Sequence, residues 1–267
     1  MHIKIILFCI AISDSSIHGS KPAPLTKENY VPVHTKTPAA FKKLKKKQLC
    51  QIDAKKAAIQ PSKQYRQLAF EALKNCNHPK PQEVVLTNDP NYEHHACAYF
   101  YNFDDTDIQA INFNEKGCFS TCSFGTQRII MHHEAAHVIL KHSAIDAQDP
   151  EYYLKKQREE RQADRLGIHA ACCKQCTLDY CQWYLEKHQK EDCQKKQFKK
   201  FNSLTLANLG KMSVQKTLHL IEQTSSLSAQ QKATHPYNIE RALRAYKVTH
   251  TSTKLCAHHQ QQAPSSN

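Results

Sequence analysis

The spacing of apolar and polar positions along this chain predicts a mainly helical protein with a few short strands. Helical periodicity extends over six ranges: 41–59, 62–75, 126–143, 178–190, 203–223 and 236–247. A further helix is expected to begin at Asp149-Pro150, because proline suits the first turn of a helix. Short runs typical of strands occupy 83–87, 96–103 and 107–113. These elements predict an α+β fold that is mainly helical.

The two ends of the chain differ in composition from its middle. The basic start and the apolar run Ile5–Ile12 are typical of a secretory signal peptide over 1–20, although a buried strand is an alternative. Residues 21–40 hold four prolines among Thr and Lys residues, which is typical of a linker. The tail 248–267 is rich in Gln, Ser and Thr, and such a composition predicts disorder. We therefore expect one domain over 41–247.

The net charge of +13 favours anionic partners such as nucleic acid, membrane surfaces or envelope polymers. The excess is spread along the chain apart from Lys42–Lys47, which we interpret as a solvated face or linker. No helix-turn-helix or zinc-finger spacing accompanies this run, so we expect no specific nucleic-acid partner. No run reaches the roughly 20 apolar residues of a transmembrane helix. We expect an exported protein, periplasmic or secreted, with peripheral contact to an anionic membrane surface as an open option.

A candidate metal site lies in the helix predicted over 126–143. His133-Glu134-Ala135-Ala136-His137 has the pattern H-E-x-x-H. Residues four apart lie on one face of a helix, so His133 and His137 can direct two imidazole nitrogens at one metal ion. Glu134 is rotated by about 100° from His133, where its carboxylate can take a proton from water. Since the chain has 17 His, a chance match is an alternative unless a third ligand follows.

A third ligand is available in the charged helical stretch 151–167. A catalytic zinc takes three protein ligands and keeps one position open. Glu160 and Asp164 are four apart on one helix face, and Glu160 can complete the set of ligands. Asp164 can accept the N–H of a ligating imidazole and fix its tautomer. On its own, this stretch would be interpreted as a solvent-exposed charged helix. Because it follows an H-E-x-x-H motif, we instead expect it to supply the third ligand of one Zn²⁺ ion per chain.

Three motifs occur in an order that resembles a known family. His133–His142 is similar to the pattern H-E-x-x-H-v-x-x-x-H, and Glu160–Asp164 is similar to E-x-x-A-D. Thr234-His235-Pro236 with the downstream Arg241 is similar to an (S/T)-H-P segment followed by Arg. The chain thus resembles the gluzincin metallopeptidases of the CAAX prenyl protease and HtpX type, through short motifs within about 95–247.

The resemblance implies a zincin-like fold with a small β-sheet against the active-site helix, in a soluble, exported member of the family. The roles that it implies are zinc binding by His133, His137 and Glu160, general acid–base catalysis by Glu134, support of a ligand by Asp164, a place near the developing oxyanion for His235, and steadying of the ligand carboxylates by Arg241.

The chain departs from the family in two places. The family has an Asn-Ala segment and a substrate-binding edge strand before the helix, where this chain has Ala110–Asn114. After Asp164, the segment Cys172–Tyr180 replaces the usual Ala-Gly-Tyr-Asp. The predicted strands can form an edge on which an extended substrate lies by strand addition. A plain core sheet is an equal alternative.

The chain has 12 Cys, of which 11 remain once Cys9 is removed with the signal peptide. In an exported protein this number favours disulfides, with at least one thiol left over. The densest group is formed by Cys172, Cys173, Cys176, Cys181 and Cys193. A second metal site that includes Cys173 and Cys176, or free thiols, are the alternatives.

The favoured function is a zinc metalloendopeptidase that hydrolyses peptide bonds in protein or peptide substrates. The resemblance implies quality control of envelope proteins as its setting. One alternative is a latent or inactive zincin-fold chaperone or protein-binding module, which binds zinc and rarely cleaves. Another is a basic nucleic-acid-binding protein with an accidental H-E-x-x-H, which predicts no tight zinc at all.

Overall fold

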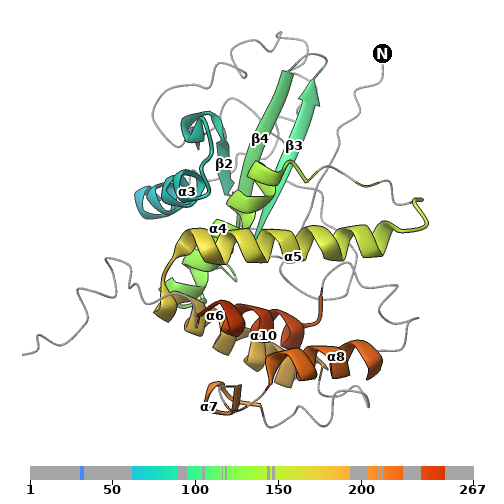
Figure 1. Ribbon diagram of the computed structural model, residues 1–267. Helices are drawn as coiled ribbons and strands as arrows, with labels where there is room; N and C mark the ends of the chain where they lie inside the picture. The colour runs from blue at the N-terminus through green and yellow to red at the C-terminus, as the bar shows by residue number, and fades with distance from the viewer. Residues whose placement is uncertain are drawn as a thin grey trace, which may run out of the picture. The chain divides into compact units, whose positions relative to one another are not determined.

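The computed structural model describes twelve stretches of the chain: 31–32, 62–88, 95–103, 106–115, 117, 119–142, 145, 148–192, 204–209, 211, 213–224 and 236–249. Their fold is mainly helical with one small sheet, an α+β arrangement (Figure 1). The predicted signal peptide, the helix expected over 41–59, and His235 lie outside these residues. The chain divides into two compact units, which are Met1–Cys122 with Ile130–Asp146, and Ser123–Ile129 with Ala147–Asn267.

The first unit contains a mixed sheet in the order β1-β2-β4-β3. Its strands are β1 (Val31–Pro32), β2 (Val85–Asn88), β3 (Ala96–Phe103) and β4 (Thr106–Phe113). β3 and β4 pair antiparallel over their full length, whereas β2 runs parallel to β4. β1 falls within the range expected to be a linker and pairs antiparallel with β2. The strand expected from residue 83 begins later, because Pro81–Glu83 forms the 3₁₀ helix η1.

Helix α3 (Lys63–Asn75) supplies much of the apolar core of the first unit. The Ser62 hydroxyl caps its N-terminus by accepting a hydrogen bond from the Tyr65 N–H at 3.5 Å. The Tyr65 ring contacts the rings of Phe113 and Phe119 at centroid distances of 5.8 and 5.3 Å. The buried face of α3 consists of Leu68, Ala69, Ala72 and Leu73.

Helix α4 (Phe124–Leu140) carries the H-E-x-x-H motif and contributes residues to both units. Its first turn is capped by the Ser123 hydroxyl, which accepts a hydrogen bond from the Thr126 N–H at 3.2 Å. The helix ends three residues before the predicted end at 143, because Lys141 adopts a left-handed conformation with φ 50°. The N–H groups of Lys141 and His142 then bond back to the carbonyls of Val138 and His137. This is a Schellman motif, which satisfies the last carbonyls of the helix.

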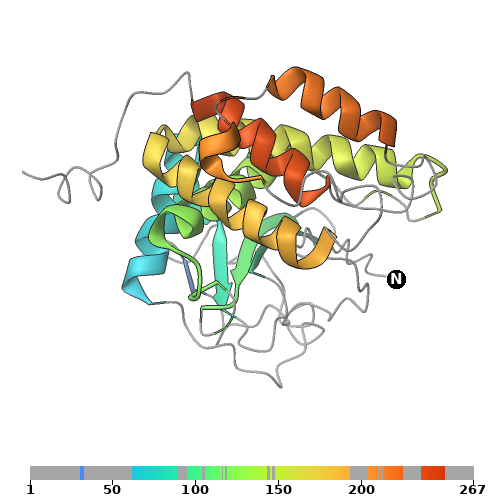
Figure 2. The same cartoon turned by 90° about the horizontal axis from the view of Figure 1, so that it is seen from below.

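The second unit consists of helices. They are α5 (Tyr152–Ala171), α6 (Lys174–Lys187), the π-helical turn η2 (His188–Asp192), α7 (Leu206–Leu209), α8 (Val214–Thr224) and α10 (Asn238–Thr249). Helix α10 packs against α5, α6 and α8 (Figures 1 and 2). No helix in the described part of the chain is long and apolar enough to cross a bilayer.

Two helix boundaries in this unit differ from those predicted. Cys172 adopts a left-handed conformation with φ 46° and ends α5, so α6 begins at Lys174 rather than at residue 178. The single helix predicted over 203–223 is two helices, α7 and α8. Ser213 explains why α8 begins where it does, because its carbonyl accepts a hydrogen bond from the Thr217 N–H and its hydroxyl accepts one from the Lys216 N–H.

The first turns of α4 are tied to the helices of the second unit. Arg128 donates a hydrogen bond from Nη1 to the carbonyl of Ala171, the last residue of α5, at 2.6 Å. Gly125 lies so close to the Asp179 carboxylate that a Cβ atom at this position would clash with it. A side chain at position 125 would therefore require the Asp179 carboxylate to move away from α4.

Candidate metal centre

His133 and His137 form a converging pair of imidazoles on α4. Both side chains are fully buried, and their Nε2 atoms lie 3.0 Å apart. The rings meet edge to face with centroids 4.6 Å apart. In a tetrahedral zinc site, Zn–N distances of about 2.0–2.1 Å separate two ligand nitrogens by about 3.3 Å. The pair therefore has close to the separation that a shared metal ion requires.

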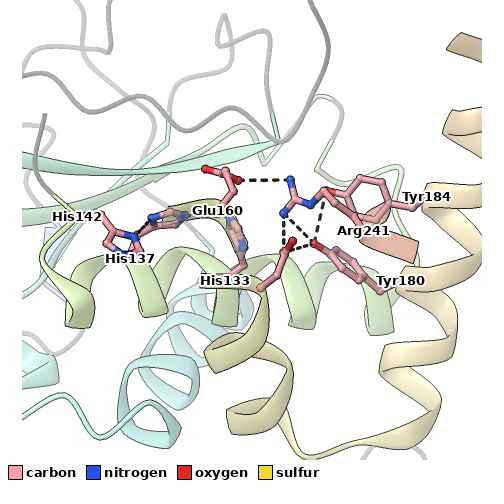
Figure 3. Close-up of polar contacts among 8 residues, drawn as sticks. His133, His137, His142, Glu160, Tyr180, Tyr184 and Arg241 are labelled. Carbon is pink, nitrogen blue, oxygen red and sulfur yellow. Dashed lines mark hydrogen bonds and ion pairs between the residues drawn. The ribbon is translucent and has the colours of Figure 1, made fainter. Parts of the chain in front are cut away.

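His142 holds the ring of His137 from the side opposite to Nε2. Its Nδ1 lies 2.7 Å from Nδ1 of His137, and the residue is buried (Figure 3). The Schellman motif at the end of α4 produces this contact, because it folds residue 142 back over residue 137. If His137 uses Nε2 as a ligand, its Nδ1 carries the proton and donates it to Nδ1 of His142. His142 thus fixes the tautomer that leaves Nε2 available for a metal.

Glu160 projects from α5 and is only 1% exposed. Nη1 of Arg241, a residue of α10, lies 3.4 Å from its Oε2. A carboxylate in such a buried place is stable only when a positive charge offsets the loss of hydration. Arg241 supplies part of that charge, and a bound metal ion would supply the rest.

Arg241 is itself held by a buried cluster of side chains. Its Nη2 donates hydrogen bonds to Asp164 Oδ1 at 2.6 Å and to the Tyr180 hydroxyl at 3.1 Å (Figure 3). The Tyr180 hydroxyl donates to the same Asp164 oxygen at 3.0 Å. The guanidinium carbon lies 4.8 Å from the centre of the Tyr184 ring, a cation–π distance.

The charge states within this cluster follow from burial and from the neighbouring charges. Burial lowers the pKa of Arg241, but the combined interactions with Asp164, Tyr180, Tyr184 and Glu160 outweigh it and raise that pKa well above its ordinary value. Burial raises the pKa of Tyr180 and of Tyr184 well above 10. Both tyrosines are therefore neutral at physiological pH and can act as hydrogen-bond donors beside a permanent cation.

His133, His137 and Glu160 form a group that can hold a metal ion. All three are buried, and their ligand atoms lie within 4.8 Å of one another. Two imidazole nitrogens and one carboxylate oxygen are the donor set of many catalytic zinc sites. Within the described residues, no other group of three or more His, Cys, Asp or Glu has this property. The three residues thus fit a metal ion.

The remaining predicted site residues are placed as follows. Glu134 is fully buried on α4, directly after His133. Asp164 accepts hydrogen bonds from Arg241 and Tyr180, and its predicted contact with a ligating imidazole stays a prediction. Arg241 contacts both Glu160 and Asp164. His235 lies outside the described residues, so the place expected for it near the oxyanion stays a prediction.

Sequence reasoning assigned no role to His142, Tyr180 or Tyr184. A signal for His142 was present, because a further histidine follows His137 after five residues, but its contact depends on how the helix ends. Tyr180 and Tyr184 are four apart on one face of α6. Their role could not be foreseen, since it requires α10 to bring Arg241 against that face.

The cysteines of the described residues give no support to the expected disulfides. No disulfide joins any two of Cys76, Cys97, Cys122, Cys172, Cys173, Cys176 and Cys181. Cys193, the last member of the dense group, lies outside the described residues.

Comparisons of the chain with protein-family models, curated proteins and solved structures found no match. The family resemblance therefore stays a prediction.

Proposed function

We propose that this protein is a zinc-dependent endopeptidase that hydrolyses peptide bonds in protein or peptide substrates. The observation that carries the proposal is the buried group of His133, His137 and Glu160. Glu134 follows the first of these ligands on the same helix. A buried site with two imidazoles, one carboxylate and an adjacent second carboxylate is the arrangement that metal-assisted peptide hydrolysis requires.

The residues of the chain divide the work of hydrolysis between them. His133, His137 and Glu160 hold the metal, and His142 keeps His137 in the tautomer that presents Nε2. When bound, zinc supplies a Lewis acid that polarises the scissile carbonyl and lowers the pKa of water. Glu134 accepts the proton of the attacking water and then delivers it to the leaving amine.

Arg241 and Asp164 act as positioning residues for Glu160. Arg241 lies 3.4 Å from the Glu160 carboxylate and stays charged, so it favours the ionised form that a metal ligand needs. Asp164 and Tyr180 fix the guanidinium in turn. This support limits the movement of Glu160, and a catalytic site needs its ligands fixed to within a fraction of an ångström.

The sheet offers a place for an extended peptide. In the described part of the chain, β3 pairs with β4 on one side only and forms one edge of the sheet. The sheet also contacts α4 within the first unit, because Gln109 of β4 donates a hydrogen bond to the carbonyl of Val138 at 3.5 Å. A substrate segment can add to β3 as a further strand, which would select extended, unfolded chains over folded domains.

A substitution of the proposed base tests this function. Glu134→Gln removes the base but keeps the size of the side chain, so the variant should retain zinc and lose cleavage of unfolded casein by at least about a hundredfold. Glu186→Gln is the matched control, since it makes the same change at an exposed position on α6. A Glu134→Gln protein with wild-type activity would refute the role of Glu134. Zinc-loaded wild type that cleaves no unfolded substrate would instead favour the latent binding module.

A further inference from the structure

The second unit contains a cavity of about 890 Å³ that is lined by α5, α8 and α10. Its walls carry six cationic side chains: Arg158, Arg161, Arg165, Lys216, Arg244 and Lys247. His169 and His219 also line it. Its volume is within the range of about 300–1,000 Å³ that is usual for small-molecule sites. The cavity therefore has the size of a ligand site and a strongly positive lining.

The negative charges near the cavity do not balance these cations. Among the described residues of the lining, Asp164 is the single acidic one, and its carboxylate already binds Arg241 at 2.6 Å. Arg158, Arg165 and Lys216 are exposed, and within the described residues no carboxylate pairs with them. Cations gathered around one hollow repel one another, so the arrangement is stabilised when an anion binds.

Glu240 gives part of this lining a fixed geometry. Its Oε1 accepts hydrogen bonds from Nε of Arg161 and Nε of Arg244, both at 2.8 Å. Arg161 also donates from Nη2 to the amide oxygen of Gln157 at 3.3 Å. Glu240 is 3% exposed, so one buried carboxylate orients two guanidinium groups at the wall of the cavity. Side chains that are already oriented lose less entropy when they bind a ligand.

The lining also indicates the chemistry of the ligand. Four of the six cations are arginines, whose planar guanidinium groups bind phosphate oxygens in pairs. The described residues of the lining include no Phe, Tyr or Trp, so they offer no platform for stacking nucleobases. We propose that this cavity binds a ligand that carries several phosphate groups and no base. Several phosphate groups on one base-free molecule occur both in free polyphosphorylated polyols and in phosphorylated lipid headgroups.

Binding of inositol hexakisphosphate to the full-length protein tests the proposal. The test variant is the triple change Arg158→Gln, Arg165→Gln and Lys216→Gln, at three exposed positions of the cavity. The control triple, Lys63→Gln, Lys74→Gln and Lys174→Gln, removes the same charge from exposed positions outside the cavity. Calorimetry at physiological salt should give saturable binding to wild type and to the control. The test variant should bind at least about a hundredfold more weakly, because each charge-assisted bond contributes about tenfold.

Vesicles that contain about 5 mol% phosphatidylinositol bisphosphate, compared with vesicles that lack it, distinguish the two sources of this chemistry. Stronger binding to the phosphorylated vesicles than to the free compound supports a lipid headgroup, and the reverse supports a soluble ligand. Two results would overturn the proposal. One is the absence of saturable binding to both probes. The other is an equal loss of binding in the test and control triples, which would mean that only the general charge of the protein attracts phosphate.

Discussion

Removal of the Arg241 charge should strongly destabilise the folded state of the second unit. The Arg241 side chain is 2% exposed and forms ion pairs with Glu160 and Asp164, which are themselves buried. The change Arg241→Met keeps an unbranched side chain of similar length but removes the charge. Two carboxylates then remain in the interior without their shared cation, and the contact with the Tyr184 ring is lost.

The expected loss of stability can be estimated from the burial of these groups. Removing one partner of a buried ion pair costs about 3–5 kcal/mol, because the remaining charge is left without compensation. We expect about 4 kcal/mol for Arg241→Met in metal-free protein. Arg244→Met is the control on the same helix: Arg244 is 37% exposed on its side chain and pairs with Glu240. Its loss should cost about 1 kcal/mol or less, since partly exposed pairs are screened by water.

Urea unfolding followed by circular dichroism, with a chelator present, measures both variants without a contribution from metal. A third variant, Arg241→Met with Asp164→Asn, removes one of the stranded charges. Its loss should be smaller than the sum of the two single losses by about 1–3 kcal/mol. Equal unfolding midpoints for Arg241→Met and Arg244→Met would refute the reasoning, as would strict additivity in the double variant.

Two further predictions concern His142 and the cysteines. His142→Ala should lower the zinc affinity by about tenfold to a hundredfold, as measured in competition with a chromophoric chelator. The control His169→Ala, at an exposed position on α5, should bind zinc as the wild type does. Equal zinc affinities of the two variants would contradict the tautomer argument. Burial raises the pKa of Cys76 to about 12, so its thiol should resist alkylation by iodoacetamide at pH 8. The exposed Cys172 should react, and peptide mass spectrometry measures the labelling of both residues. Rapid labelling of Cys76 in native protein would show that it is not shielded.

The parts of the fold that the sequence predicted are those determined by local pattern. The short aromatic run in 96–103 predicted β3 with the same bounds, and the helical periodicity in 62–75 predicted α3 to within one residue. Helix ends were predicted less well, because they depend on single residues in left-handed conformations. Lys141 and Cys172 end α4 and α5, and neither residue type favours such a conformation as glycine does.

The candidate site also combines features that the local sequence predicts with features that it does not. The two imidazoles and the neighbouring Glu134 follow from the spacing of one motif on one helix. The surroundings of Arg241 do not, since Tyr180 and Asp164 are separated from it by 61 and 77 residues along the chain. Only the packing of α10 against α5 and α6 brings these groups together, and no pattern within a single helix contains that information.

The zinc content of purified protein tests the central claim most directly. Elemental measurement should find about one zinc per chain in the wild type and almost none in Glu160→Ala, because a catalytic site needs all three of its protein ligands. Glu159→Ala is the matched control, since it removes the neighbouring carboxylate on α5, which pairs with Lys156, and it should keep its zinc. Wild-type protein without zinc, or zinc that persists in Glu160→Ala, would contradict the proposed site.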